Sequence, residues 1–387
     1  MVFRFLLSIA WLFVAFYFTW EYYWFSKVNW HFVRWHTHLA PFALAILLLL
    51  TLTQFVQIKE RTVLLTSSVC IGLALAEVLL FARNPNGDVM FISQLKTNPT
   101  NYYHAWPANA THYLKKEEFN YQRHTNSLGF SDKEWRIEKD TSKIRVLSLG
   151  DSFTEGDAAP ADSAYPFLMQ KILGESYEVM NAGTCGSDPL FNYKNLEDRL
   201  LQYKPDIVVQ TISTNDLLND LPLRGGFERF QPNDKIKENS PPAWFYPAMI
   251  SVVFRTLLTT FNNNIGKAPV IDNTYLTNLE TILQQLTFNF DNLGKQHDMK
   301  IIFVLLPLKN EVQNNKYDYN YLPLQQMAAQ SNTIRTLDLL PCYAQKIHLS
   351  GSDFKTFYWQ IDQHHNSTGY KLMAECIAEK VLRITEQ

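Results

Sequence analysis

The sequence predicts an α/β fold in which helices cover both faces of a mainly parallel sheet, preceded by three transmembrane helices. Two observations lead to this prediction. From Ile144 onward, short apolar segments of strand length alternate with amphipathic segments of helical spacing. Before residue 83, the chain instead contains long apolar runs with almost no charge. We therefore divide it into a transmembrane region (1–83), a connector (84–143) and an α/β domain (144–387).

The membrane-spanning helices are expected at about residues 3–20, 39–58 and 62–82. Each segment approaches the roughly 20 apolar residues that a helix needs to cross the hydrocarbon core. A cleaved signal peptide is the alternative for the first segment, but bulky aromatic residues follow its apolar core. The distribution of Lys and Arg slightly favours a cytoplasmic N-terminus. An odd number of spans then places the α/β domain outside the cytoplasm.

The elements of the α/β domain alternate in type along the chain. Pro205 ends the second helix, and Ser367 or Thr368 can cap the last one. Residues 220–274 interrupt the alternation, and we interpret them as an insertion that is either a lid or partner surface, or a peripheral loop. Strands are expected at 144–149, 177–183, 207–213, 300–307 and 333–340, and helices at 163–175, 192–206, 275–295 and 367–384.

Charge and cysteine content narrow the function classes. The 35 Lys and Arg residues nearly balance the 37 Asp and Glu residues, so nothing indicates a nucleic-acid partner. The four cysteines (Cys70, Cys185, Cys342 and Cys376) show no CxxC or metal-site spacing. We expect free, buried thiols, although an extracytoplasmic location would permit a disulfide between Cys342 and Cys376.

The motif GDSFTEG (150–156) directly follows the strand at 144–149. It places Ser152 between the end of a strand and the start of a helix, where unpaired backbone N–H groups favour developing negative charge. A Gly-Asp-Ser turn alone is weak evidence for a nucleophile, because Asp and Ser also cap helices. A serine hydroxyl becomes an effective nucleophile only with a base and with donors for the oxyanion.

Three later motifs supply those groups at other junctions of the predicted fold. In such folds the carboxyl ends of the strands gather at one edge of the sheet, where ligands bind. Each motif alone has a plain structural explanation as a turn, a cap or a surface pair. The motifs offer the Gly186 N–H in NAGTCGSDP, the Asn215 amide in STND, and Asp362 with His364 and His365 in DQHHNSTGY.

Together these motifs resemble the SGNH branch of the GDSL hydrolase superfamily, whose blocks centre on Ser, Gly, Asn and a C-terminal Asp/His pair. The resemblance covers roughly residues 120–385 and includes NSLGF (126–130), which is similar to a stretch of bacterial membrane-associated members. It implies an SGNH-type, flavodoxin-like domain of three layers that needs no cofactor and no metal.

The resemblance also implies a role for each residue of the set. Ser152 would be the nucleophile, and Asp362 would orient the histidine base. The N–H groups of Ser152 and Gly186, with the amide of Asn215, would form the oxyanion hole. In the third block, Ser213 stands where the family usually has glycine, which we expect to adjust the pocket wall only.

Two histidines compete for the role of base. The usual Asp-x-x-His spacing of the family selects His365, whereas an Asp-x-His variant and the usual distance to the helix-start Gly369 select His364. We predict His364, with His365 as the alternative.

The predicted function is that of a membrane-anchored serine esterase in the bacterial inner membrane. Its substrates would be O-acyl esters, acetyl esters among them, of an envelope glycan or lipid. One alternative is an O-acyltransferase that uses the same site to move an acyl group onto a polysaccharide. The partner that we expect is a separate membrane acyltransferase, beside which the esterase would act. Another is a non-catalytic assembly partner, which the complete set of site residues disfavours.

Overall fold

The computed structural model describes residues 47–48, 51, 60–83, 106–230, 253, 257, 271–351 and 353–386. The chain divides into two compact units. One comprises Met1–Lys96 and Asn239–Lys267, and the other comprises Thr97–Glu238 and Ala268–Gln387.

In the first unit, the main described element is helix α3 (Glu60–Arg83). Among the residues that the structure describes, no helix has the length and apolar character needed to cross a membrane. The span expected at 62–82 coincides with α3 and is therefore not supported; polar residues, Glu77 among them, interrupt its apolar sequence. The spans expected at 3–20 and 39–58 lie outside the described residues, apart from a few positions near residue 50.

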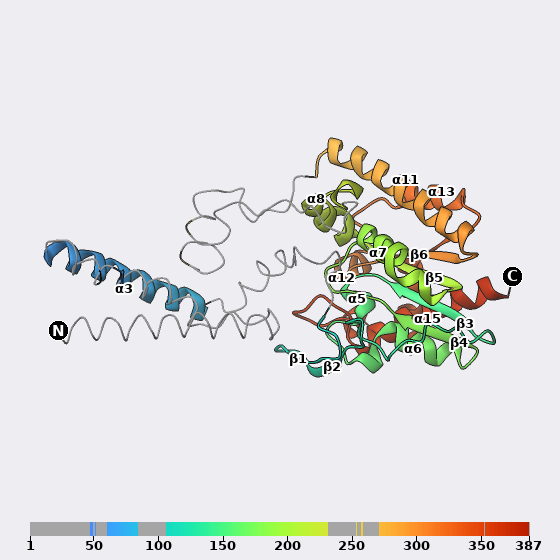
Figure 1. The fold of residues 1–387 in the computed structure, drawn as a ribbon, viewed down its shortest axis with the longest axis horizontal. Coiled ribbons are helices and arrows are strands. Elements are labelled where there is room, and N and C mark those ends of the chain that lie inside the picture. Colours follow the sequence, from blue (N-terminus) through green and yellow to red (C-terminus); the bar gives the residue numbers. More distant parts are fainter. Residues whose placement is uncertain are drawn as a thin grey trace. The chain divides into compact units, whose positions relative to one another are not determined.

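The second unit is built on a five-stranded sheet in which all neighbouring strands are parallel, as the sequence predicts (Figure 1). In chain order its strands have the arrangement 2-1-3-4-5, which is the flavodoxin-like order. The order reverses between the first and third of these strands, and ligands bind at such a switch point. Across the sheet the strands are β4 (Tyr177–Asn181), β3 (Ile144–Leu149), β5 (Ile207–Ser213), β6 (Lys300–Leu306) and β7 (Ile334–Asp338).

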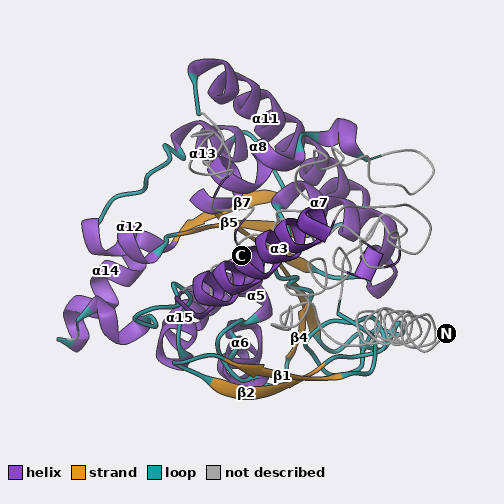
Figure 2. Ribbon diagram, turned by 90° about the vertical axis from the view of Figure 1, so that its left-hand side faces the viewer, coloured by secondary structure: helices purple, strands orange, loops and turns teal. Residues whose placement is uncertain are grey.

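Helices cover both faces of the sheet, which gives three layers (Figures 1 and 2). Because successive side chains of a strand point to opposite faces, Leu147 packs into one core and Val146 into the other. The first core includes residues of α7 (Pro189–Asn195), α11 (Asn273–Gln296) and α13 (Leu322–Ala329). The second core includes residues of α6 (Tyr165–Leu173), α14 (Leu339–Ser350) and α15 (Ser367–Thr385).

Local sequence sets where these helices begin. The helix expected from residue 192 begins earlier, at Pro189, because the Asp188 side chain accepts hydrogen bonds from the first backbone N–H groups. The last helix is capped by Asn366 rather than by Ser367 or Thr368. Short elements complete the unit: α5 (Ser152–Glu155), α8 (Leu221–Arg224), α12 (Lys309–Asn314), 3₁₀ turns at Ala161–Ser163, Leu201–Tyr203, Phe227–Arg229 and Phe354–Phe357, and π-helical turns at Leu196–Leu200 and Asp216–Asp220.

The predicted connector contains an antiparallel hairpin, β1 (Thr111–Lys115) and β2 (Asn120–His124). Buried and exposed residues alternate along β2, and Tyr121 and Arg123 point inward. An inward arginine breaks the alternation of apolar and polar residues that indicates a half-buried strand, so no strand was predicted here.

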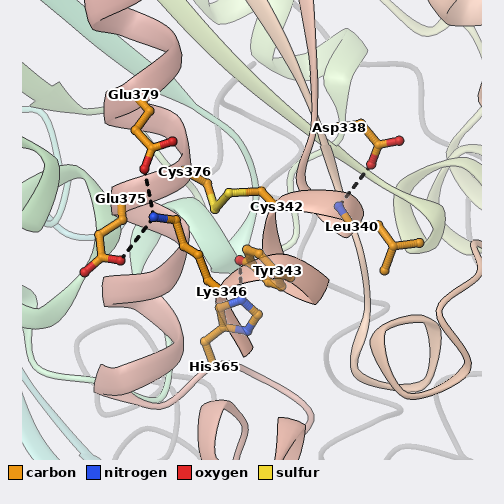
Figure 3. The surroundings of a disulfide bond; sticks show 9 residues. All are labelled: Asp338, Leu340, Cys342, Tyr343, Lys346, His365, Glu375, Cys376 and Glu379. Atoms are coloured by element: carbon orange, nitrogen blue, oxygen red, sulfur yellow. Dashed lines mark hydrogen bonds and ion pairs between the residues drawn. A yellow bond between two sulfur atoms is a disulfide. The ribbon is translucent and has the colours of Figure 1, made fainter. Parts of the chain in front are cut away.

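A disulfide joins Cys342 of α14 to Cys376 of α15 (Figure 3). The expectation of free thiols is therefore wrong for this pair. The two helices pack side by side on the same face of the sheet, which brings the two Cα atoms to 6.2 Å, within the range that a disulfide spans. Within the described residues, neither Cys70 nor Cys185 forms a disulfide.

Candidate active site

Ser152 lies at the first position of α5, directly beyond the end of β3. The Asp151 side chain caps this short helix by accepting a hydrogen bond from the Phe153 N–H (2.9 Å). Gly156 ends it in a left-handed conformation (φ 88°), which glycine adopts without strain. The tight turn presents the Ser152 hydroxyl on a partly buried surface at the carboxyl edge of the sheet.

The structure brings His364 to Ser152. His364 Nε2 lies 2.8 Å from Ser152 Oγ, and its Nδ1 lies 2.5 Å from Asp362 Oδ1. The same Asp362 oxygen accepts the His364 backbone N–H (3.1 Å), so the carboxylate fixes both the ring and the main chain. The Phe153 ring packs against the imidazole, with the ring centroids 4.8 Å apart. A hydroxyl, an imidazole and a carboxylate thus form one continuous chain of hydrogen bonds.

His365 points elsewhere, although it is adjacent in sequence. Its side chain is fully buried, and its Nε2 lies 2.8 Å from the hydroxyl of Tyr343 on α14 (Figure 3). Its ring also packs edge-on against Tyr358, with the centroids 4.4 Å apart. Burial lowers the pKa of His365 to about 3, with a contribution from the charge of His364, so His365 is a neutral core residue.

Hydrogen bonds join the loop after β3 to the loop after β4 and to the end of β5. Ser187 donates a hydrogen bond to the Gly150 carbonyl (2.9 Å), and the Thr154 and Thr211 hydroxyls lie 2.8 Å apart. A Cβ atom on Gly183 would collide with the backbone of α5, so this position requires glycine. The carboxyl ends of three neighbouring strands therefore form one compact edge around Ser152.

The two predicted oxyanion donors outside the nucleophile turn both lie on this edge. Gly186 has a left-handed backbone (φ 73°), and no hydrogen bond to its N–H is recorded among the described residues. Asn215 follows β5, the strand that pairs with β3. Its Nδ2 donates to Asp220 (2.9 Å) and its Oδ1 accepts from Asn219 (2.9 Å), so the amide is held by its own turn.

Carboxylates surround the imidazole and raise its affinity for a proton. Burial disfavours the charged form of His364, but its hydrogen bond to the Asp362 carboxylate and the charges of Asp157, Asp362 and Asp151 outweigh burial, so the pKa of His364 lies above its usual 6.5. Burial raises the pKa of Asp151 to about 6. For Asp157, burial opposes ionisation, but the charges of His364, Arg123 and Lys116 outweigh it and lower the pKa to about 2.

Comparison with known families identifies the domain. Residues 148–372, more than half of the chain, match the GDSL-like lipase/acylhydrolase family. The chain belongs to this family. The prediction of an ester-cleaving serine hydrolase is therefore confirmed at the level of the family. No curated protein is significantly similar to the chain.

Solved structures similar to this GDSL-like protein include several esterases. A two-domain esterase (CEX) active on acetylated mannans is 14% identical, with 63% of this chain and 51% of that chain covered and a TM-score of 0.38. An acetyl xylan esterase, AlAXEase, is 17% identical, with 62% and 100% covered and a TM-score of 0.36. The acetylxylan esterase Axe2 from Geobacillus stearothermophilus, as a catalytic mutant, is 16% identical, with 63% and 96% covered and a TM-score of 0.38. The chain spans about half the length of the two-domain esterase.

Sequence reasoning missed the residues of this GDSL-like protein that contact Asp362 from outside its own loop. Lys116 Nζ lies 2.6 Å from Asp362 Oδ2, and the Glu118 carboxylate accepts the Asp362 backbone N–H (2.7 Å). Both residues lie in the turn between β1 and β2, within the predicted connector. No spacing signal links them to Asp362, because Lys116 and Asp362 are 246 positions apart.

Proposed function

We propose that the protein is a serine esterase that cleaves O-acyl esters through an acyl-enzyme formed on Ser152. The observation that carries the proposal is the hydrogen-bonded chain from Ser152 Oγ through the imidazole of His364 to Asp362. Such a chain activates a hydroxyl that is a poor nucleophile by itself. Membership in the GDSL-like lipase/acylhydrolase family supports the same chemistry.

In the proposed mechanism, His364 Nε2 takes the proton from Ser152 Oγ as the oxygen attacks the ester carbonyl. Asp362 holds the imidazole with its Nδ1–H toward the carboxylate and stabilises the imidazolium. The tetrahedral oxyanion would be stabilised by the N–H groups of Ser152 and Gly186 and by the Asn215 amide. The imidazolium then protonates the leaving alcohol, and the C–O bond to that alcohol breaks.

Deacylation repeats these steps with an activated water as the nucleophile and releases the carboxylic acid with free Ser152. A sugar hydroxyl in place of this water would give the transferase outcome. The two outcomes differ only in the acceptor, so product analysis with and without a polysaccharide acceptor distinguishes them. Hydrolysis remains our proposal, with acetyl esters of a glycan or lipid as the first substrates to try.

We further propose that the second unit functions outside the cytoplasm. The Cys342–Cys376 disulfide supports this location, because disulfides persist in oxidising compartments and are rare in the cytosol. Blocking free thiols before and after reduction, in protein taken directly from cells, tests this proposal. A pair found reduced under the first condition would contradict it.

A serine-directed fluorophosphonate followed by peptide mapping tests the esterase proposal. The label should appear on Ser152, and Ser152→Ala should abolish both labelling and the hydrolysis of aryl acetate. Ser163→Ala is the matched control, because Ser163 lies in a partly exposed turn that follows the nucleophile turn in sequence, and its hydroxyl donates to the neighbouring Asp162. Label on another residue, or full aryl-ester hydrolysis by Ser152→Ala, would refute the proposal.

A further inference from the structure

The turn between β1 and β2, here called the hairpin turn (Lys116–Phe119), contacts the loop that carries Asp362. A hydrogen bond from the Lys116 N–H to the Phe119 carbonyl (2.9 Å) closes the turn. The Lys116 side chain is half-exposed and reaches Asp362, whereas the Asp362 side chain is mostly buried. The hairpin turn therefore adds a positive charge on the side of Asp362 away from the imidazole.

Glu118 binds the backbone of the same loop. Its carboxylate accepts three successive backbone N–H groups, from Gln360 (2.7 Å), Ile361 (2.9 Å) and Asp362 (2.7 Å). Hydrogen bonds to an ionised acceptor are among the stronger ones in proteins. One side chain thus fixes the main chain directly before the Asp362 side chain, over a segment without helix or strand structure.

The two oxygens of the Asp362 carboxylate have separate partners. Oδ1 accepts from the backbone N–H of His364 and lies against its Nδ1, whereas Oδ2 accepts from Lys116. Burial opposes ionisation of Asp362, but the hydrogen bond and charge of His364, followed by those of Lys116, hold the pKa of Asp362 far below its usual value. The carboxylate is therefore ionised, and its orientation toward the imidazole is fixed from both sides.

We propose that Lys116 and Glu118 are positioning residues for the reaction, and that Lys116 sets the proton affinity of His364 through Asp362. This inference rests on the proposed function, in which His364 is the base. A cation bound to one oxygen of Asp362 withdraws part of the negative potential that stabilises the imidazolium at the other oxygen.

The charged groups around His364 determine whether its pKa rises or falls when the Lys116 charge is removed. Asp151 and Asp157 face it from the two ends of the nucleophile turn, and Asp362 faces it from its own loop. Arg123, which forms an ion pair with Asp157, partly neutralises that side. His365, a further titratable neighbour, is neutral because burial lowers its pKa to about 3. On the Asp362 side, the Glu118 anion binds the loop backbone, and the Lys309 ammonium donates to the carbonyls of Trp359 and Gln360. Lys116 is the cation that contacts the Asp362 carboxylate itself. Removing the Lys116 charge takes this contacting cation from the carboxylate and strengthens proton binding by His364.

Lys116→Met removes the charge and keeps the apolar stem, whereas Lys116→Arg keeps the charge. The pH dependence of kcat/KM for an aryl acetate has an acid limb set by protonation of the base. For Lys116→Met we expect this limb to move to higher pH by about 0.5–1 unit, because solvent screens a half-exposed charge. Lys116→Arg should leave the limb within about 0.2 unit of the wild type. KM at high pH should not change.

A second measurement does not depend on turnover. In protein with ¹⁵N-labelled histidine, the Nδ1–H of His364 hydrogen-bonded to Asp362 gives a low-field proton signal whose titration reports the proton affinity of the ring. Lys116→Met should shift this midpoint upward by the same amount as the kinetic limb. If the midpoint shifts but no ester is cleaved, the proposed function fails, and only the electrostatic coupling between Lys116 and His364 stands. If esters are cleaved but neither the midpoint nor the limb moves, the inference is overturned.

Glu118→Gln tests whether the Glu118 carboxylate holds the backbone of residues 360–362. The amide has one acceptor oxygen in place of a carboxylate, so amide hydrogen exchange of residues 360–362 should accelerate about tenfold or more and kcat should fall, with KM unchanged. Glu117→Gln, an exposed neighbour in the same turn, controls for a general effect on the hairpin. A rise in KM alone for Lys116→Met would assign Lys116 to substrate binding and overturn its proposed positioning role. Unchanged amide exchange in Glu118→Gln would show that Glu118 does not hold the backbone of residues 360–362, which overturns the second part of the proposal.

Discussion

The buried ion pair between Arg123 of β2 and Glu155 of α5 gives the sharpest stability prediction. Both side chains are fully buried. Arg123 also donates to the Gly156 carbonyl (2.9 Å) and to the Tyr121 hydroxyl (3.2 Å). Glu155 in turn accepts the Trp106 indole N–H (2.7 Å). The pair therefore joins the hairpin to the helix that carries Ser152.

The proposed perturbation is Arg123→Met, which keeps much of the apolar volume and removes the charge. It leaves the Glu155 carboxylate buried with no cation against it. Removing one partner of a buried ion pair costs about 3–5 kcal/mol. A domain of this kind has a total stability of about 5–15 kcal/mol, so we expect a large loss that leaves the protein folded in the absence of denaturant.

Equilibrium urea unfolding followed by tryptophan fluorescence measures the loss, because Trp106 lies in the network itself. Glu155→Gln and the double variant complete a double-mutant cycle, in which the double variant should lose less than the sum of the single variants by about 2 kcal/mol or more. Lys194→Met removes a cation from a partly exposed set of ion pairs and should cost less than about 1 kcal/mol.

Two results would refute this reasoning. One is a loss below about 1 kcal/mol for Arg123→Met, and the other is additivity of the two single variants. Glu155 also accepts the Cys185 N–H (2.5 Å), next to Gly186. A destabilised variant that keeps full esterase activity when folded would show that the network does not position the predicted oxyanion donor.

Three further predictions concern the site and its support. His364→Ala should reduce kcat/KM for aryl acetate by about 10³-fold or more. His365→Ala should retain most activity but lose about 2–4 kcal/mol of stability, because the substitution leaves a cavity and an unpaired Tyr343 hydroxyl. The reverse pattern would assign the role of base to His365. Activity should fall about tenfold per pH unit below the pKa of His364, which lies above 6.5 because of the surrounding carboxylates, since only the neutral imidazole accepts a proton; a flat profile down to pH 5 would exclude His364 as the base. Reducing the Cys342–Cys376 disulfide, which links positions 34 residues apart, should lower stability by about 3–4 kcal/mol through loop-closure entropy. Thermal unfolding with and without reductant measures this loss of stability, and an unchanged Tm would contradict the prediction.

The arrangement of the sheet could be predicted because its signal is local. Buried segments such as Ile207–Ser213 are apolar throughout, and helices separate them, which is the pattern of parallel strands covered on both faces. The polar motifs end such segments, so the sequence also placed Ser152 and Asn215 at the same edge of the sheet. The membrane spans were read from apolar composition alone, and within the described residues that reading is not supported.

Local spacing favoured His364 as the base but left His365 as an alternative. Both follow Asp362 within three positions and both belong to the same polar motif. The two rings differ in their environments. The His364 ring contacts a hydroxyl and a carboxylate at the edge of the sheet. The His365 ring packs in the core against Tyr343 and Tyr358. The bridge between Tyr358 and His365 fixes which ring points inward.

By itself, the sequence determined the parallel α/β fold, the edge of the sheet at which polar chemistry gathers, and the small set of side chains to look for there. Periodicity and motif spacing are properties of residues that are close in sequence, so they can be recognised from the amino-acid sequence alone. Only the tertiary structure decided which imidazole meets Ser152, that the hairpin turn binds Asp362, and that two cysteines pair across neighbouring helices. These contacts join residues as far as 246 positions apart, and they exist only because the packing of the sheet and helices brings those residues together.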